Sequence, residues 1–500
     1  MRTRTLAEVR ASGDLALFAP ALDRLRTPAD ASEEFISTFI ATDRPVTIAR
    51  APGRLDVMGG IADYSGSLVL EMPLACATFA IAQPQDSRRL EILSLRGGQP
   101  FTFGIDLDEI LTGSLATPDA LAERFAERPG DRWAAYVVGA VWRCLTLCGV
   151  TRPPHGLRVL VLSEVPEGKG VSSSAALEVS AMAATAACYG VRMTGAELAT
   201  ACQWAENHIA QAPCGIMDQM TSALGRRNRL LRLRCQPAMV EGYIEVPAGY
   251  RFYGIDSGIR HAVSGADYGT VRTAAFMGYR MIAALAGLRT TSDGPIARVE
   301  DNRWQGYLAN ISPAEYSARF ADRLPARMDG GEFLARYGGI TDSATQVEPG
   351  RSYPVRQATS HPVHENDRVK RFAELLATGL GRPEHARRMG ELMLESHASY
   401  SACGLGSDGT DLLVRLVTEL GEERGLFGAK ITGGGSGGTV AVLGTDAARE
   451  AMFDVARRYE RSTGRSAIVF EGSGPGAEEI GVLELPAGRW QASIELGGSG

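Results

Sequence analysis

Apolar and polar positions alternate along this chain in a way that predicts mixed strands and helices. From Val46, the segment VTIARAPGRLDVMG alternates like a strand and then breaks into glycines. Further strands are expected at residues 157–166, 251–259, 438–443, 467–470 and 480–485. Helices are expected at residues 133–149, 172–190, 267–288 and 364–400. Because the two kinds of element do not alternate regularly, the pattern favours an α+β fold over a doubly wound sheet.

Length and composition are those of an ordinary globular protein with two domains. The 500 residues exceed what one hydrophobic core usually organises. A net charge of -6 gives no electrostatic reason to expect nucleic acid or an anionic membrane as a partner. Charges interrupt every apolar stretch before it reaches membrane-spanning length, and the eight cysteines follow no metal-binding spacing. We therefore expect a cytoplasmic protein with reduced thiols.

The segment PEGKGVSSSAALEV, residues 166–179, has the character of a phosphate-binding loop. Its glycines allow a tight turn, and the amides at the start of the following helix would face an anion. It is not a Walker A loop, because Lys169 is followed by Gly170 instead of serine or threonine. It is not a dinucleotide fingerprint either, because Ser173 stands where the third glycine belongs. A glycine-serine turn that only caps a buried helix is the alternative.

A second glycine-rich loop occupies residues 430–443, KITGGGSGGTVAVL, between two strand-like flanks. Glycines at this density cost considerable backbone entropy, so something is expected to approach this backbone closely. The sequence leaves open whether that partner is a ligand or another loop.

These two loops, together with RAPGRLDVMGGIADYSG at 50–66 and APCGIMDQM at 212–220, resemble the GHMP kinases in sequence and order. The segments at 50–66 and 212–220 look like the galactokinase branch. GGIADYSGSLVL at 59–70, CGLGSDGTD at 403–411 and FEGSGPGA at 470–477 resemble its L-arabinokinase members. The resemblance implies ATP and Mg²⁺ as cofactors and a small sugar as substrate. It also implies a ribosomal-S5-like N-terminal domain and a ferredoxin-like C-terminal domain, with the active site between them.

The sequence pattern and the resemblance together divide the chain into four parts. Residues 1–44 are expected to be a helical N-terminal extension, and residues 45–235 the GHMP kinase N-terminal domain. Residues 236–490 are expected to form the C-terminal domain, with an irregular insertion near 300–360. Residues 491–500, which end in GGSG, are expected to be a flexible tail.

The resemblance also implies roles for individual residues. Asp218 would be the catalytic base, either taking the proton or mainly orienting the hydroxyl, with Arg54 beside it. Ser174 and Glu206 would bind magnesium, whereas Glu178 is expected to be a charge on the helix face. ATP would contact Gly168, Lys169, Gly170, Val171, Ser172, Ser173 and Ser174. The sugar would contact Gly60, Ile61, Asp63, Gly215 and Tyr268.

Positions 60 and 61 depart from the galactokinase pattern, which reads GEHTDY where this chain has GGIADY. In that family the acidic residue and the histidine contact the hydroxymethyl side of galactose. Gly60 and Ile61 offer no polar side chain there, which suits L-arabinose, a sugar without the hydroxymethyl group. The resemblance therefore favours L-arabinose 1-kinase activity. Galactose or another galactose-like sugar, a non-sugar alcohol and a non-catalytic sugar sensor remain alternatives.

Overall fold

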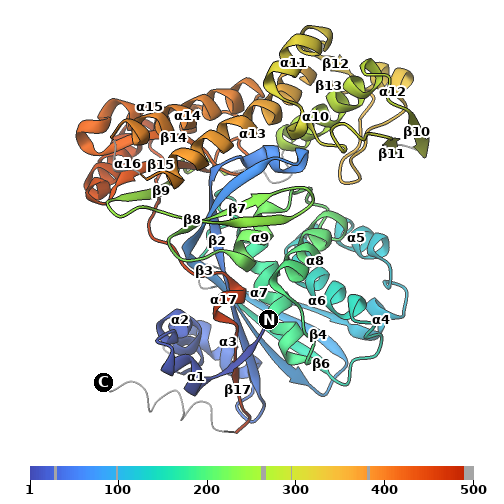
Figure 1. Cartoon of the computed structure of the whole chain (residues 1–500). Helices are drawn as coiled ribbons and strands as arrows, with labels where there is room; N and C mark the ends of the chain where they lie inside the picture. Colours follow the sequence, from blue (N-terminus) through green and yellow to red (C-terminus); the bar gives the residue numbers. More distant parts are fainter. Residues whose placement is uncertain (27–30, 97–98, 261–265, 294–295, 380–382, 489–500) are drawn as a thin grey trace.

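The computed structural model describes residues 1–26, 31–96, 99–260, 266–293, 296–379 and 383–488, and the tail expected at 491–500 lies outside them. Two units follow one another from bottom to top in Figure 1. Each unit combines a sheet with helices, so the expected α+β class is confirmed. In the described part of the chain, no helix has the length and apolar character needed to cross a membrane.

A nine-stranded sheet forms the lower unit, with β2 (Val46–Met58) and β3 (Leu68–Gln85) as its long central pair. The strand order is β1-β17-β2-β3-β6-β4-β5, and β7 and β8 extend the sheet from β3. The remaining strands are β1 (Thr3–Thr5), β4 (Arg89–Arg96), β5 (Gln99–Asp106), β6 (Gly156–Ser163), β7 (Arg229–Arg234), β8 (Met239–Glu245) and β17 (Val482–Leu485). Every residue of β2 is buried, because helices cover both faces of the sheet.

Neighbouring residues of β2 face opposite sides of the sheet, as the strand period of two requires. Ile48 packs against the N-terminal helices, whereas Ala49 faces the other helical layer. The N-terminal helices are α1 (Leu6–Ala11), α2 (Leu15–Arg26) and α3 (Ala31–Phe39). The other layer comprises α4 (Leu107–Leu111), α5 (Pro118–Ala126), α6 (Ala135–Leu147), α7 (Ser173–Cys188), α8 (Gly195–His208) and α9 (Met217–Leu224). The three N-terminal helices are thus docked on the sheet by apolar side chains such as Val9, Phe18 and Ile36.

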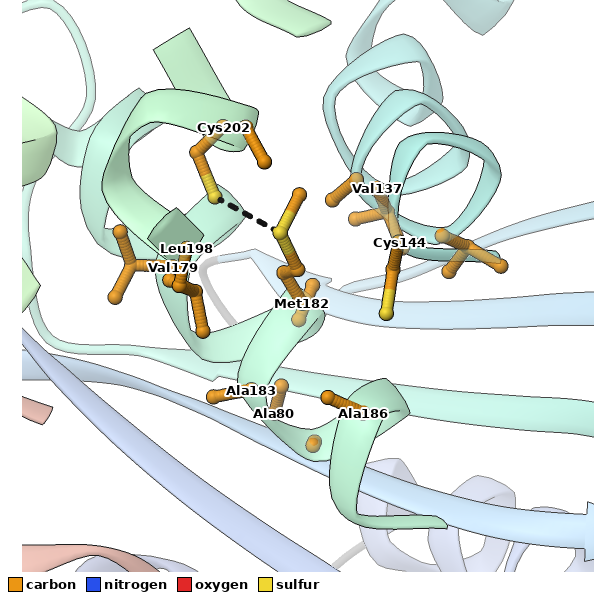
Figure 2. Close-up of a cluster of buried hydrophobic side chains, with 14 of the residues drawn as sticks. Ala80, Val137, Cys144, Val179, Met182, Ala183, Ala186, Leu198 and Cys202 are labelled. Atoms are coloured by element: carbon orange, nitrogen blue, oxygen red, sulfur yellow. Dashed lines mark hydrogen bonds between the residues drawn. The ribbon is translucent and has the colours of Figure 1, made fainter. Parts of the chain in front are cut away.

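Small side chains bring helix α7 close to the sheet. Ala183 and Ala186 lie over Ala80 of β3, and Met182 faces Cys202 of α8 (Figure 2). The Cys202 thiol donates to the Met182 sulfur across 3.7 Å. This close packing fixes where α7 begins, which matters because its N-terminus borders the candidate site.

An antiparallel four-stranded sheet of order β14-β15-β9-β16 forms the core of the upper unit. Its strands are β9 (Tyr250–Asp256), β14 (Leu426–Ile431), β15 (Thr439–Thr445) and β16 (Val469–Phe470). Its main helices are α10 (Ala266–Leu285), α13 (Val355–Ala377), α14 (Pro383–Ala402), α15 (Asp408–Leu420) and α16 (Arg449–Thr463). The single helix expected at 364–400 is therefore wrong. Two helices span this region, and the second begins at Pro383, a residue that suits a first helical turn.

Residues 300–360 are more regular than expected. They contain α11 (Pro313–Arg319), α12 (Gly330–Tyr337) and the short pair β12 (Met328–Asp329) and β13 (Ser352–Tyr353). Before them, β10 (Thr290–Asp293) pairs with β11 (Ile296–Val299). Buried aromatic side chains, among them Trp304, Phe320 and Phe333, give the segment its own core together with α10 and α13.

Two strands from the range expected to form the C-terminal domain pair with the lower sheet instead. β8 pairs with β7, and β17 lies between β1 and β2 after the short helix α17 (Ala477–Ile480). At β17 the chain therefore returns to the sheet that contains β1.

Candidate active site

A cavity lies between the two units, and residues from both line it. β2, α7, α8 and the segment before α9 supply one side, while α10 and the loop between β14 and β15 supply the other. Its lining side chains and backbone include Arg54, Ile61, Asp63, Gly168, Gly170, Ser172, Ser173, Ser174, Glu206, Gly215, Asp218, Tyr268, Gly433 and Gly434. Most residues that the sequence assigned to a site therefore converge on one space.

Asp218 lies in the first turn of α9 and is held by two donors. Arg54 Nε donates to Asp218 Oδ1 at 2.8 Å, and the Ser172 hydroxyl donates to Oδ2 at 2.5 Å. Arg54 also donates to the carbonyl of Gly170 at 2.8 Å, which ties the phosphate-type loop to the same guanidinium. With both oxygens engaged, the Asp218 carboxylate is fixed in orientation and faces the cavity.

Arg54 is almost fully buried in a cluster of acidic groups. Burial lowers the pKa of Arg54, but Asp218 and Glu71 outweigh burial and hold the pKa above its ordinary value. Glu71 lies 3.5 Å from Arg54 on β3, and burial raises the pKa of its carboxyl well above the usual range. The sequence did not point to Glu71, because a glutamate within a strand usually faces solvent.

The loop before α7 adopts the backbone conformation that its glycines permit. Gly168 and Gly170 have φ values of 70° and 72°, and Ser172 has a φ of 59° although it carries a side chain. Ser172 occupies the N-cap position of α7, yet its hydroxyl bonds Asp218 and caps no amide. The first-turn amides of α7 are consequently left for another partner, and the cavity borders them.

The glycine loop at 432–438 approaches this first loop directly. A Cβ on Gly433 would stand 3.0 Å from the Gly170 carbonyl, and one on Gly438 would stand 3.0 Å from the Lys169 carbonyl. Both glycines also have positive φ. The sequence left open whether a ligand or another loop approaches this backbone. In the structure, the loop before α7 approaches it. Lys169 itself points to the upper unit, where its ammonium pairs with buried Asp256 at 2.6 Å.

Glu206 and Ser174 lie side by side at the cavity, as a magnesium site would require. Burial raises the pKa of Glu206 to about 7, while a hydrogen bond with Ser174 acts in the opposite direction. Gln219 donates from its amide nitrogen to Glu206 at 2.5 Å and to Glu178 at 3.2 Å. The expectation that Glu178 is a charge on the helix face is wrong. Its side chain is fully buried beside Glu206, where α7 and α8 pack together.

Asp63, Gly215 and Tyr268 form a wall of the cavity. Asp63 is 4% exposed, and its Oδ1 has no hydrogen-bond partner among the residues that the structure describes. Burial, with a further contribution from Asp218, raises the pKa of Asp63 to about 7. A Cβ on Gly215 would stand 1.6 Å from Asp63 Oδ2, so only glycine fits this place. Ile61 lines the cavity beside them, whereas Gly60 lies behind the wall and not on it.

Arg272 and Asp342 support this wall and were not identified from the sequence. Their side chains form a buried pair with two hydrogen bonds of 2.8 Å. Arg272 also donates to the carbonyl of Cys214, next to Gly215, at 2.9 Å. The two residues lie 70 positions apart, and Asp342 belongs to the segment that was least legible in the sequence. No local pattern signals such a pair.

Comparisons with known proteins match both units. Residues 135–226 match the GHMP kinases N terminal domain, residues 373–461 match the GHMP kinases C terminal domain, and residues 33–84 match the galactokinase galactose-binding signature. L-Arabinokinase of Arabidopsis thaliana is 43% identical over 490 residues, which cover 89% of this chain and 47% of that protein. The chain thus spans about half the length of that relative.

Galactokinases resemble the chain over most of their own length. Galactokinase of Chloroflexus aggregans is 30% identical over 425 residues, covering 84% of this chain and 90% of the relative. A crystal structure of Lactococcus lactis galactokinase complexed with galactose superposes with a TM-score of 0.66 at 22% identity, covering 89% of this chain and 97% of that one. Mevalonate kinase of Methanococcus jannaschii superposes with a TM-score of 0.51 at 14% identity, covering 85% of this chain and 97% of that one.

Proposed function

The chain belongs to the GHMP kinase family, in its galactokinase and L-arabinokinase branch, and on this premise we propose that it is a sugar 1-kinase. It would transfer the γ-phosphate of ATP to the anomeric hydroxyl of L-arabinose and give L-arabinose 1-phosphate. One observation carries the proposal. The carboxylate of Asp218 is oriented by Arg54 and Ser172 at a cavity that also borders the N-terminus of α7.

Phosphoryl transfer requires positioning and charge neutralisation more than covalent help from the protein. The Asp218 carboxylate accepts a hydrogen bond from the sugar hydroxyl and so orients the attacking oxygen. The carboxylate then receives the proton of this hydroxyl as the bond between oxygen and phosphorus forms. Arg54 pairs with Asp218 and offsets the negative charge of the transferred group. The amides of the first turn of α7, aligned with the helix dipole, hold the phosphates of ATP.

Ser174 and Glu206 would hold Mg²⁺. They present a hydroxyl and a carboxylate side by side, and magnesium prefers such oxygen ligands together with phosphate oxygens and water. A bound magnesium ion would neutralise phosphate charge during transfer. Within the described part of the chain, the neighbouring buried oxygen atoms Glu178 Oε1 and Gln219 Oε1 have no hydrogen-bond partner. Oxygen atoms that can still accept an interaction fit a site for a cation.

Preference for L-arabinose is supported by the apolar Ile61 at the cavity wall. Asp63 and Tyr268, which line the same cavity, would bond ring hydroxyls, and L-arabinose and galactose share these hydroxyls. The hydroxymethyl group of galactose would find no polar side chain at Ile61, so its hydroxyl would be poorly paired. Apolar pockets reject an added hydroxyl by about 10- to 100-fold, and we expect discrimination of this size. The L-arabinokinase relative supports the same substrate.

The test is an ADP-release assay with Mg-ATP and L-arabinose, D-galactose, L-fucose, D-glucuronate or mevalonate. We expect the highest kcat/KM with L-arabinose and no turnover by the Asp218→Asn variant. Higher kcat/KM with D-galactose would make the protein a galactokinase. ATP binding without turnover of any acceptor would leave the non-catalytic sensor as the better account.

A further inference from the structure

Gly60 has a steric partner in the upper unit. A Cβ on Gly60 would stand 1.6 Å from the phenol oxygen of Tyr400, 2.8 Å from its Cζ and 2.7 Å from Asp56 Oδ2. Tyr400 lies near the end of α14 and is fully buried. Gly60 also has a φ of 46°, which a larger residue adopts only with strain. The phenol of Tyr400 therefore occupies the space into which any side chain at position 60 would extend.

The Tyr400 hydroxyl connects the sugar wall to the glycine loop. It accepts a hydrogen bond from the backbone N–H of Ile61 at 2.8 Å and donates to the carbonyl of Gly433 at 3.1 Å. Ile61 and Gly433 both line the cavity. A single oxygen atom from α14 thus holds two parts of the cavity at a set separation.

Several contacts hold the phenol ring itself in place. The Lys430 ammonium lies 5.3 Å from the ring centroid and pairs with Asp56 at 2.6 Å, with both charged side chains fully buried. Asp56 Oδ1 accepts from the N–H of Gly60 at 3.0 Å. The His361 ring packs edge-on against the phenol ring, and the two ring centroids lie 5.1 Å apart. Because these groups pack against the ring and its hydroxyl is hydrogen-bonded to Ile61 and Gly433, Tyr400 acts as a fixed support.

The segment 403–411, which the catalytic roles do not use, continues this support. The carbonyl of Leu405 accepts from the N–H of Ser436 at 2.7 Å. A Cβ on Gly435 would stand 2.7 Å from the Cβ of Leu405. The chain after Tyr400 therefore packs on the same glycine loop that Tyr400 reaches through Gly433.

We propose that Tyr400 is a positioning residue that sets sugar specificity, by fixing Ile61 at the cavity wall and by keeping position 60 free of a side chain. The inference rests on the proposed function and extends it to a residue 340 positions away in the sequence from Gly60. Specificity is then a property of three residues, Gly60, Ile61 and Tyr400, and not of the first two alone. Substituting positions 60 and 61 while Tyr400 is retained would place the new side chain at position 60 against the phenol ring.

The test compares Tyr400→Phe with the wild-type enzyme on L-arabinose and D-galactose. The variant keeps the ring and the Lys430 contact but leaves the Ile61 N–H without its acceptor. We expect KM for L-arabinose to rise by about 5- to 30-fold, the range that one buried hydrogen bond supports, with kcat within about threefold. We expect the ratio of kcat/KM for the two sugars to fall, because the loosened wall discriminates less.

A matched control is Tyr353→Phe. Its hydroxyl is also an acceptor for a backbone N–H, that of Glu348 at 2.8 Å, but it does not border the cavity. We expect the Tyr353→Phe sugar ratio to equal that of the wild type. Equal losses on both sugars in Tyr400→Phe, or the same ratio change in Tyr353→Phe, would overturn the inference and leave the proposed function standing. Wild-type enzyme that phosphorylates neither sugar would overturn both.

A double-mutant cycle tests the steric part without relying on turnover. Gly60→Ala should lower the melting temperature in the wild-type background, because the new Cβ meets the phenol. In the Tyr400→Leu background that atom is gone, so Gly60→Ala should cost clearly less. Strictly additive decreases in the melting temperature would contradict a direct contact between the two positions.

Discussion

Gly215→Ala is the smallest change that should disable the sugar site. The added Cβ would stand 1.6 Å from Asp63 Oδ2, 2.0 Å from Cγ and 2.3 Å from Oδ1, so it overlaps the whole carboxylate group. Gly215 does not have a positive φ, which means that alanine is tolerated by the backbone and the effect is steric alone. Relief requires the carboxylate to move by more than about 1 Å, and a displacement of this size costs about 100-fold in rate.

The assay is steady-state turnover with L-arabinose at saturating Mg-ATP, beside ATP binding measured by calorimetry. We expect kcat/KM for the sugar to fall by about 100-fold or more while ATP affinity stays within about threefold. Gly130→Ala is the matched control, because nothing lies within 4 Å of its added Cβ and its φ is ordinary. Activity of Gly215→Ala within threefold of the wild type would refute the close approach of Gly215 and Asp63.

Three further variants probe the groups around this wall. Ser172→Ala removes a donor to Asp218, and we expect kcat to fall by about 10-fold at an unchanged KM for ATP; unchanged kcat would count against that hydrogen bond. Because burial and then Asp218 raise the pKa of Asp63 to about 7, the folded protein binds this proton more tightly than the unfolded chain. The contribution of Asp63 to the free energy of unfolding therefore falls as pH rises from about 4 to about 7, by up to about 4 kcal/mol. Asp63→Asn should abolish sugar turnover yet resist more urea than the wild type at pH 8, and lower urea resistance there would refute the shift. Asp342→Ala leaves Arg272 buried without its partner, and urea unfolding should show a loss of about 3–5 kcal/mol, whereas a loss below 1 kcal/mol would show that water reaches the site.

Local sequence patterns predicted the elements that carry the chemistry. The strand beginning at Val46, the helix at 172–190 and the glycine-rich loops are present where periodicity and glycine placement put them. The family resemblance then predicted that Arg54, Asp218 and Asp63 share one site, and in the structure all three line the same cavity. These predictions succeeded because each depends on residues close together in the chain or on a motif with a defined order.

The remaining features depend on contacts between distant segments. Glu178 follows the phosphate-type loop by about one helical turn and looked solvent-exposed, yet α8 packs over it and buries it beside Glu206. The Arg272–Asp342 pair and the contact of Tyr400 with Gly60 join positions far apart in sequence. Hydrophobic periodicity carries no information about which buried polar groups will meet. Such partners are seen only when the fold is known.

The most direct test of the central claim is a competition experiment. Wild-type enzyme receives equal concentrations of L-arabinose and D-galactose with limiting Mg-ATP, and nuclear magnetic resonance identifies and quantifies the sugar phosphates. The product ratio equals the ratio of the two kcat/KM values. We predict phosphate on carbon 1 and an excess of L-arabinose 1-phosphate of about 10-fold or more. Equal amounts of both products, or an excess of galactose 1-phosphate, would contradict the specificity, and phosphate on any other carbon would contradict the placement of Asp218 at the anomeric hydroxyl.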